Sequence, residues 1–125
     1  MDMCKSGKEI VLDVEKRYTM FEEKIVLCVA NSYEEKYYLS EDFQSLPKPV
    51  KDELKIMCVL YTEEIGGNLS LEFEEDGSLE FVVRTGKNDF LFDEIGSVLK
   101  IKQMREDRRD LLEALETYYI IFFLQ

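Results

Sequence analysis

The clearest periodicity in the chain is a helical one between residues 50 and 65. Apolar side chains recur there every three or four residues, which is the spacing of one helix face: Val50, Leu54, Met57, Tyr61 and Ile65. A proline at position 49 is tolerated in a first helical turn, and the two glycines that follow residue 65 are a typical helix end. Residues 56–61 are apolar around the whole circumference, so the sequence predicts a helix sandwiched in the centre of the core.

Two short antiparallel pairs of strands are predicted on either side of this helix. Residues 25–29 form a continuous apolar run, which is typical of a strand that is buried on both faces. Residues 36–39 are expected to return beside it as an antiparallel partner. In the second pair, apolar and polar residues alternate over residues 69–73 and 79–83, with Asp76-Gly77 between the two strands.

The register of the second pair follows from its loop length. A two-residue loop at Asp76-Gly77 would place Phe73 opposite Glu80 and put an apolar side chain on a polar face. A three-residue loop over residues 75–77, with the glycine in the left-handed region, pairs Phe73 with Leu79 and keeps the apolar residues together. We predict this second register. It makes Glu72 and Glu80 neighbours on the exposed face, which is unfavourable unless a cation or a basic side chain lies over them.

The C-terminal region predicts a long helix. From Asp93 to about Phe123 only Gly96 disfavours a helix, and about 30 residues at about 1.5 Å each would extend about 45 Å. A globule of this chain length is only about 35 Å across. The middle of the segment is highly charged and its far end is apolar. We therefore expect either a bend in the middle of the helix or a projecting helix whose far end packs on another chain.

Together these elements predict an α+β fold, in which a small antiparallel sheet of two hairpin-like pairs packs against a central helix and a long C-terminal helix. A chain of 125 residues is the length of one domain. We assign this domain to residues 24–125 and treat residues 1–23 as an N-terminal extension, partly helical or disordered. Within the extension, residues 9–22 fit either a helix or a short strand, and the spacing of their apolar residues favours the helix.

The composition excludes several classes of function. With 27 acidic residues against 16 basic ones the net charge is −11, so nonspecific attraction to nucleic acid or to an anionic membrane is not expected. The absence of histidine excludes Ser-His-Asp and Cys-His nucleophile arrangements and histidine-based metal sites. The three cysteines are widely spaced, which is typical of reduced, buried thiols and not of a zinc site. We expect no cofactor and no metal, and we favour a non-enzymatic function.

The distribution of apolar residues predicts neither a membrane-spanning segment nor a signal peptide. The longest apolar run, residues 118–124, is far shorter than the roughly 20 residues that cross a bilayer. The apolar run near the N-terminus, residues 10–12, is too short for the core of a signal peptide. We therefore expect a cytoplasmic protein.

The leading functional hypothesis is a protein-interaction module that self-associates through its C-terminal helix. The far end of that helix carries an apolar stripe where an isolated tip should be polar, and a basic segment precedes it. We predict a homodimer in which the stripe packs on a second copy and the basic segment faces an acidic surface. The predicted contact residues are Leu111, Leu115, Tyr118, Phe122, Arg105 and Arg108.

The alternative hypothesis is a small-molecule or cation-binding protein, possibly a weak enzyme, that uses residues 31–38 or the acidic hairpin. Tyrosines with amide and hydroxyl neighbours are found at ligand-binding surfaces, and Asn31, Tyr33 and Tyr37 are the candidates here. The same residues also fit the rim of a half-buried sheet. The hairpin tip from Glu72 to Gly77 begins like a calcium loop, but its twelfth position is Val83 where a glutamate is needed, so a solvated turn is favoured.

Several segments also carry a family resemblance: residues 25–28 (Ile-Val-Leu-Cys), 30–34 (Ala-Asn-Ser-Tyr-Glu), 36–39 (Lys-Tyr-Tyr-Leu), 55–64 (Lys-Ile-Met-Cys-Val-Leu-Tyr-Thr-Glu-Glu) and 93–97 (Asp-Glu-Ile-Gly-Ser). Over about residues 24–124 the chain resembles a family of uncharacterised proteins from clostridial Firmicutes. It has Val29 where a glycine is expected in the family. The family has no assigned activity, so the resemblance implies a bacterial cytosolic setting and no catalytic residue.

Overall fold

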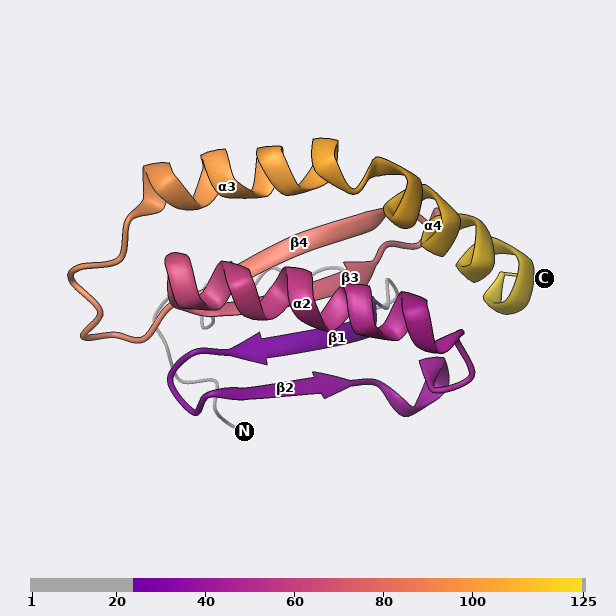
Figure 1. Ribbon diagram of the computed structural model, residues 1–125, viewed down its shortest axis with the longest axis horizontal. Helices are drawn as coiled ribbons and strands as arrows, with labels where there is room; N and C mark the ends of the chain where they lie inside the picture. The colour runs from indigo at the N-terminus through magenta and orange to yellow at the C-terminus, as the bar shows by residue number, and fades with distance from the viewer. Residues whose placement is uncertain (1–23, 125) are drawn as a thin grey trace.

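The framework of the fold is an antiparallel sheet of four strands in the order β2-β1-β3-β4 (Figure 1). The computed structural model describes residues 24–124, and the predicted helix over residues 9–22 lies outside them. The strands are β1 (Ile25–Asn31), β2 (Lys36–Leu39), β3 (Asn68–Phe73) and β4 (Leu79–Arg84). The helices are α2 (Lys48–Glu64), α3 (Glu94–Asp107) and α4 (Arg109–Phe123), with a 3-10 turn η1 (Glu41–Phe43) before α2. The predicted α+β fold is confirmed.

The predicted register of the β3–β4 hairpin is confirmed. Phe73 pairs with Leu79, and the loop between them closes through hydrogen bonds that Glu74 makes with Ser78 and Gly77. Gly77 has φ +92°, a left-handed conformation that costs glycine nothing. A Cβ at this position would also lie only 2.7 Å from the Ile120 side chain of α4. The turn therefore needs glycine both for its backbone and for the close approach of α4.

The cross-strand pairing of Glu72 and Glu80 is also confirmed, but the expected exposure of Glu72 is wrong. Glu72 is only 3% exposed. Arg84 lies 3.4 Å from its carboxylate, and the Ser70 hydroxyl donates to the same oxygen at 2.8 Å. Lys24 donates to Glu80 at 3.0 Å. Basic side chains therefore offset the repulsion between the two carboxylates, as the register required.

Helix α2 buries one face and not its whole circumference. The predicted face is confirmed, since Leu54, Met57 and Tyr61 are buried. The expectation of a helix sandwiched in the core is wrong, because Ile56 and Leu60 are 52% and 45% exposed. Figure 1 shows the reason: α2 lies in front of the sheet, and no other helix or strand of residues 24–124 covers its outer side.

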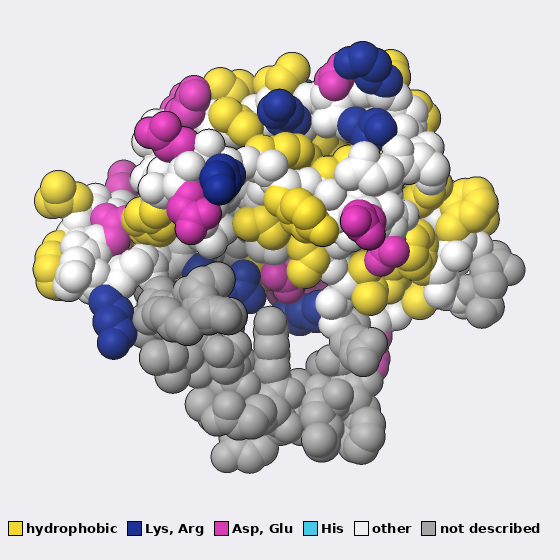
Figure 2. Space-filling view, turned by 90° about the horizontal axis from the view of Figure 1, so that it is seen from below, with side chains coloured by type: hydrophobic (Ala, Val, Ile, Leu, Met, Phe, Trp, Pro, Cys, Tyr) yellow, Lys and Arg dark blue, Asp and Glu magenta, His cyan; other side chains and the backbone are white. Residues whose placement is uncertain are grey.

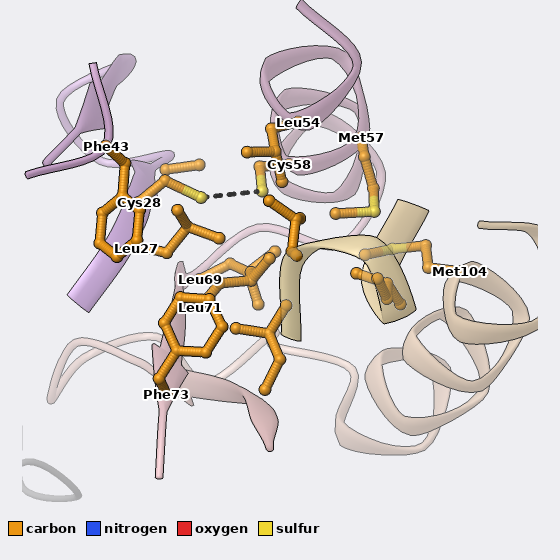
Figure 3. Close-up of a cluster of buried hydrophobic side chains, with 14 of the residues drawn as sticks. Leu27, Cys28, Phe43, Leu54, Met57, Cys58, Leu69, Leu71, Phe73 and Met104 are labelled. Carbon is orange, nitrogen blue, oxygen red and sulfur yellow. Dashed lines mark hydrogen bonds between the residues drawn. The ribbon is translucent and has the colours of Figure 1, made fainter. Parts of the chain in front are cut away.

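Two cysteines join α2 to the sheet in the core. Cys28 of β1 and Cys58 of α2 are fully buried free thiols, and their sulfur atoms lie 3.7 Å apart (Figure 3). Apolar side chains from both sheet and helices surround them, among them Leu27, Leu54 and Leu71. This arrangement agrees with the interpretation of these thiols as reduced core residues.

The C-terminal helical segment bends at Arg108, where φ is −119° and ψ is 32°. Of the two geometries left open by the sequence, bending is the one observed. The bend turns α4 over the end of the sheet (Figure 1), where Leu115 and Tyr119 are buried. The Tyr119 ring stacks on Phe73 of β3 with centroids 4.3 Å apart. The apolar far end therefore contributes to the chain's own core.

Candidate functional site

A pocket of about 600 Å³ lies between α2 and the turn that joins β1 to β2. This volume is within the range of small-molecule sites. Helix α2 contributes Lys55, Val59, Thr62 and Glu63 to its wall. The end of β1, the turn and the start of β2 contribute Asn31, Ser32, Glu35, Lys36 and Tyr37.

Local hydrogen bonds of Asn31 shape the wall that the turn provides. Its side-chain oxygen accepts from the backbone N–H groups of Tyr33 and Glu34, at 2.9 and 3.3 Å. Asparagine favours such turns because its side chain imitates a backbone carbonyl. Glu35 then adopts φ 55°, which reverses the chain into β2. The Asn31 amide nitrogen has no partner within the described chain and is free to donate.

Tyr37 provides a half-buried aromatic wall. Its hydroxyl is buried and makes no hydrogen bond within residues 24–124. Burial raises the pKa of Tyr37, and the nearby thiols of Cys28 and Cys58 raise it further. Both effects favour the protonated phenol.

The rim of the pocket carries charges of both signs. Lys36 and Glu35 lie on the turn side, and Lys55 and Glu63 lie on α2. Among residues 24–124 no ion pair involves any of these four side chains. They are therefore available to a ligand that bears both charges.

Of the tyrosines predicted to contact a ligand, Tyr33 does not line this pocket. Its hydroxyl donates to Asp89 at 2.6 Å and accepts from the Gly86 N–H at 2.9 Å. Tyr33 thus connects the β1–β2 turn to the loop that follows β4. The structure brings Asn31 and Tyr37 together and places Tyr33 in a separate, structural contact.

The residues predicted for self-association are mostly used within the chain itself. Leu115 is only 2% exposed, Leu111 is half-buried, and the Tyr118 hydroxyl lies 3.2 Å from Ser45. Phe122 is 65% exposed. The two basic candidates also have partners in the fold: Arg105 lies over the Phe81 ring and Arg108 pairs with Glu53.

A different apolar surface, which the sequence reasoning missed, lies on the outward side of α3 and on the loop before it. Each of its large side chains is more than 60% exposed: Phe90, Leu91, Ile95, Val98 and Leu99. We call these five residues the α3 apolar face. Apolar side chains project at the end of the molecule where this loop lies (Figures 1 and 2). In the sequence, the α3 segment has apolar residues on more than one side. In the structure, only the side of α3 that carries Ser97 and Met104 is buried.

Two features are absent from the described residues, a metal-binding cluster and a membrane-spanning helix. No group of three or more cysteine, aspartate or glutamate side chains within residues 24–124 is arranged to hold a metal ion. In the same part of the chain, no helix combines the length and the apolar character that a membrane crossing requires.

The buried thiols allow a direct prediction. In a Cys4→Ser background, we expect Cys28 and Cys58 of the native protein to react with a thiol reagent at least about a hundredfold more slowly than free cysteine, because reaction requires local opening. The hydrogen bond with Cys28 and burial both raise the pKa of Cys58, which disfavours its reactive thiolate. Labelling followed by mass spectrometry, with and without urea, measures this. Rapid native labelling of Cys28 would instead indicate an accessible nucleophile.

Fold and surface together define a small α+β protein with a polar pocket beside its central helix and an exposed apolar helix face. The chain belongs to the DUF6145 family, a family of unknown function, whose model matches residues 24–125. The chain shows no significant similarity to any curated protein or to any solved structure. The predicted resemblance to an uncharacterised family is thus confirmed over this range, and its clostridial origin stays a prediction.

Proposed function

We propose that the chain is a non-enzymatic, cytoplasmic protein-interaction module that forms a homodimer through the α3 apolar face. The observation that supports this is the exposure of the five side chains of that face. Apolar patches of this kind on a small protein mark interaction surfaces. The C-terminal helical segment keeps its predicted role in self-association, but the contact lies on its first half.

The α3 apolar face would form the centre of a dimer interface. A large aliphatic side chain has about 100 Å² of apolar surface, and Phe90 has at least about 150 Å². The exposed parts of the five side chains therefore supply about half of the roughly 800 Å² per partner of a standard interface, and neighbouring polar residues would supply the rest. Phe90 and Ile95 line one open hollow, so the loop and the helix contribute to a continuous surface.

The charges along α3 favour a second copy as the partner. The helix begins with the acidic residues Asp93 and Glu94, and the exposed Lys102 lies about two turns later. In an antiparallel pairing of two α3 helices centred on Val98, Lys102 of each copy lies opposite the first turn of the other. A twofold axis repeats this favourable contact on both sides of the interface.

The experiment is to measure the mass of the wild type and of Leu99→Asp in solution. Multi-angle light scattering at micromolar concentration should give twice the chain mass of 14.8 kDa for the wild type. Leu99 is 61% exposed, so an aspartate there should leave the fold intact. It would, however, bury a charge at the contact, and we expect the dissociation constant to rise at least about tenfold.

Two matched variants locate the contact. Ile56→Asp changes an apolar residue on α2 that is similarly exposed, at 52%, and should leave the dimer unchanged. Phe122→Asp changes the exposed apolar residue at the end of α4 and should also leave it unchanged. If the wild type is a monomer at high concentration, or if only Phe122→Asp dissociates the dimer, the α3 apolar face is not the contact.

A further inference from the structure

We infer that the pocket between α2 and the β1–β2 turn binds a small zwitterion, namely a free α-amino acid with an apolar side chain. This inference concerns a site remote from the α3 apolar face and does not depend on dimer formation. It rests on the unpaired charges at the rim, the unused hydrogen-bonding groups of the wall and the two apolar wall residues.

The charges define what the ligand must carry. Each side of the pocket has one cation and one carboxylate: Lys36 and Glu35 on the turn side, Lys55 and Glu63 on α2. None of them is in an ion pair within the described residues. The four charges sum to zero, so a ligand with a single net charge would leave one charge in the pocket without an opposite partner. A zwitterion satisfies both signs at once.

The neutral groups of the wall favour a carboxylate in particular. The Asn31 amide group keeps its N–H donors, because only its oxygen is used in the turn. The Ser32 backbone N–H is occupied by the Gly67 carbonyl, whereas its hydroxyl has no partner among residues 24–124. Two neutral donors beside two lysines are suited to the oxygens of an α-carboxylate.

The apolar part of the wall accommodates a side chain. Val59 and the ring of Tyr37 line the pocket next to the polar groups. A volume of about 600 Å³ is ample for one amino acid and its water shell. The apolar side chain of the amino acid would pack against Val59 and Tyr37, and its ammonium and carboxylate groups would face the charged rim.

The test is an amide NMR titration of the full chain, preceded by a thermal-shift screen of the twenty amino acids at millimolar concentration. L-leucine is the representative apolar probe. We expect an apolar amino acid to shift amide resonances of residues 31–37 and 55–63 in a saturable way. Leucine methyl ester, which lacks the carboxylate, and N-acetyl-leucine, which lacks the ammonium group, should each bind at least tenfold more weakly.

Matched variants assign the site on α2. Lys55→Gln removes a rim cation, whereas Lys51→Gln changes a lysine one turn earlier that donates to the Gln44 carbonyl. Glu63→Gln removes a rim carboxylate, whereas Glu64→Gln changes its neighbour, which pairs with Lys100. We expect only Lys55→Gln and Glu63→Gln to weaken binding, by about tenfold. Lys55, Glu63 and Glu64 are exposed and Lys51 is only half-buried, so the variants should fold.

Three results would overturn the inference. The first is that no amino acid changes the melting temperature or these resonances at 10 mM. The second is that the acetylated or esterified leucine binds as well as leucine itself, because the ligand class would then not be zwitterionic. The third is that the control variants Lys51→Gln and Glu64→Gln weaken binding as much as Lys55→Gln and Glu63→Gln do.

Discussion

Leu115→Asp is expected to remove a large part of the stability of the protein. Leu115 lies on the buried side of α4 and is 2% exposed, so the aspartate would place a charge in the core without a partner. Such a change combines the loss of a buried leucine with the burial of an unpaired charge and exceeds about 4 kcal/mol. This is a large part of the 5–15 kcal/mol by which a domain of this size is stable. Circular dichroism and urea unfolding of the purified variant measure it.

The control for this experiment is Phe122→Asp, seven residues further along α4. Phe122 is 65% exposed, and its replacement should lower the free energy of unfolding by less than about 1 kcal/mol. A Leu115→Asp variant that is as stable as the wild type would show that α4 is not part of the core. That result would favour the other geometry that the sequence allowed, a C-terminal helix that projects from the domain.

The second large effect concerns the buried ion pair of the sheet. Arg84→Ala is expected to destabilise the protein by about 3 kcal/mol, because it removes the charged partner of the carboxylate of Glu72, a residue that is only 3% exposed. The Ser70 hydroxyl still donates to one carboxylate oxygen, but the other has no hydrogen-bond partner in the described residues. One neutral hydrogen bond does not compensate a buried charge.

A second substitution separates the lost charge pair from lost packing of the arginine stem. In the Arg84→Ala background, Glu72→Gln should recover more than half of the lost stability, because it removes the uncompensated charge and keeps the shape. Urea unfolding of the wild type, both single variants and the double variant gives the coupling energy. A coupling energy near zero would mean that the 3.4 Å contact between Arg84 and Glu72 contributes nothing to stability.

Much of the fold could be predicted because local pattern and tertiary structure agree. The β3–β4 register followed from the alternation of apolar residues and from Gly77, since a shift of one residue would turn every side chain to the other face. The buried face of α2 followed from the helical spacing of Leu54, Met57 and Tyr61. The candidate site was predicted only in part: Asn31 and Tyr37 line the pocket, whereas Tyr33 contacts Asp89 instead.

The sequence could not predict which apolar surfaces are covered by other elements of the fold. Periodicity shows that a helix has an apolar face, but not whether another element lies against it. Ile56 and Leu60 of α2 and the α3 apolar face are therefore exposed although their composition resembles that of a core. The bend at Arg108 was not predictable at this position either, because no proline or glycine marks it in the sequence. The packing of α4 on the sheet requires this bend.

The amino-acid order alone was thus sufficient for the class of the fold, the order of its described elements, the hairpin register and the buried face of α2. These properties depend on interactions between residues close in sequence or on a strict two- or 3.6-residue period. The tertiary structure alone decided the burial of Glu72 beside Arg84, the return of α4 to the core, the pocket beside α2 and the exposed α3 apolar face. Each of these depends on contacts between distant segments, whose geometry is set by the packing of the whole chain.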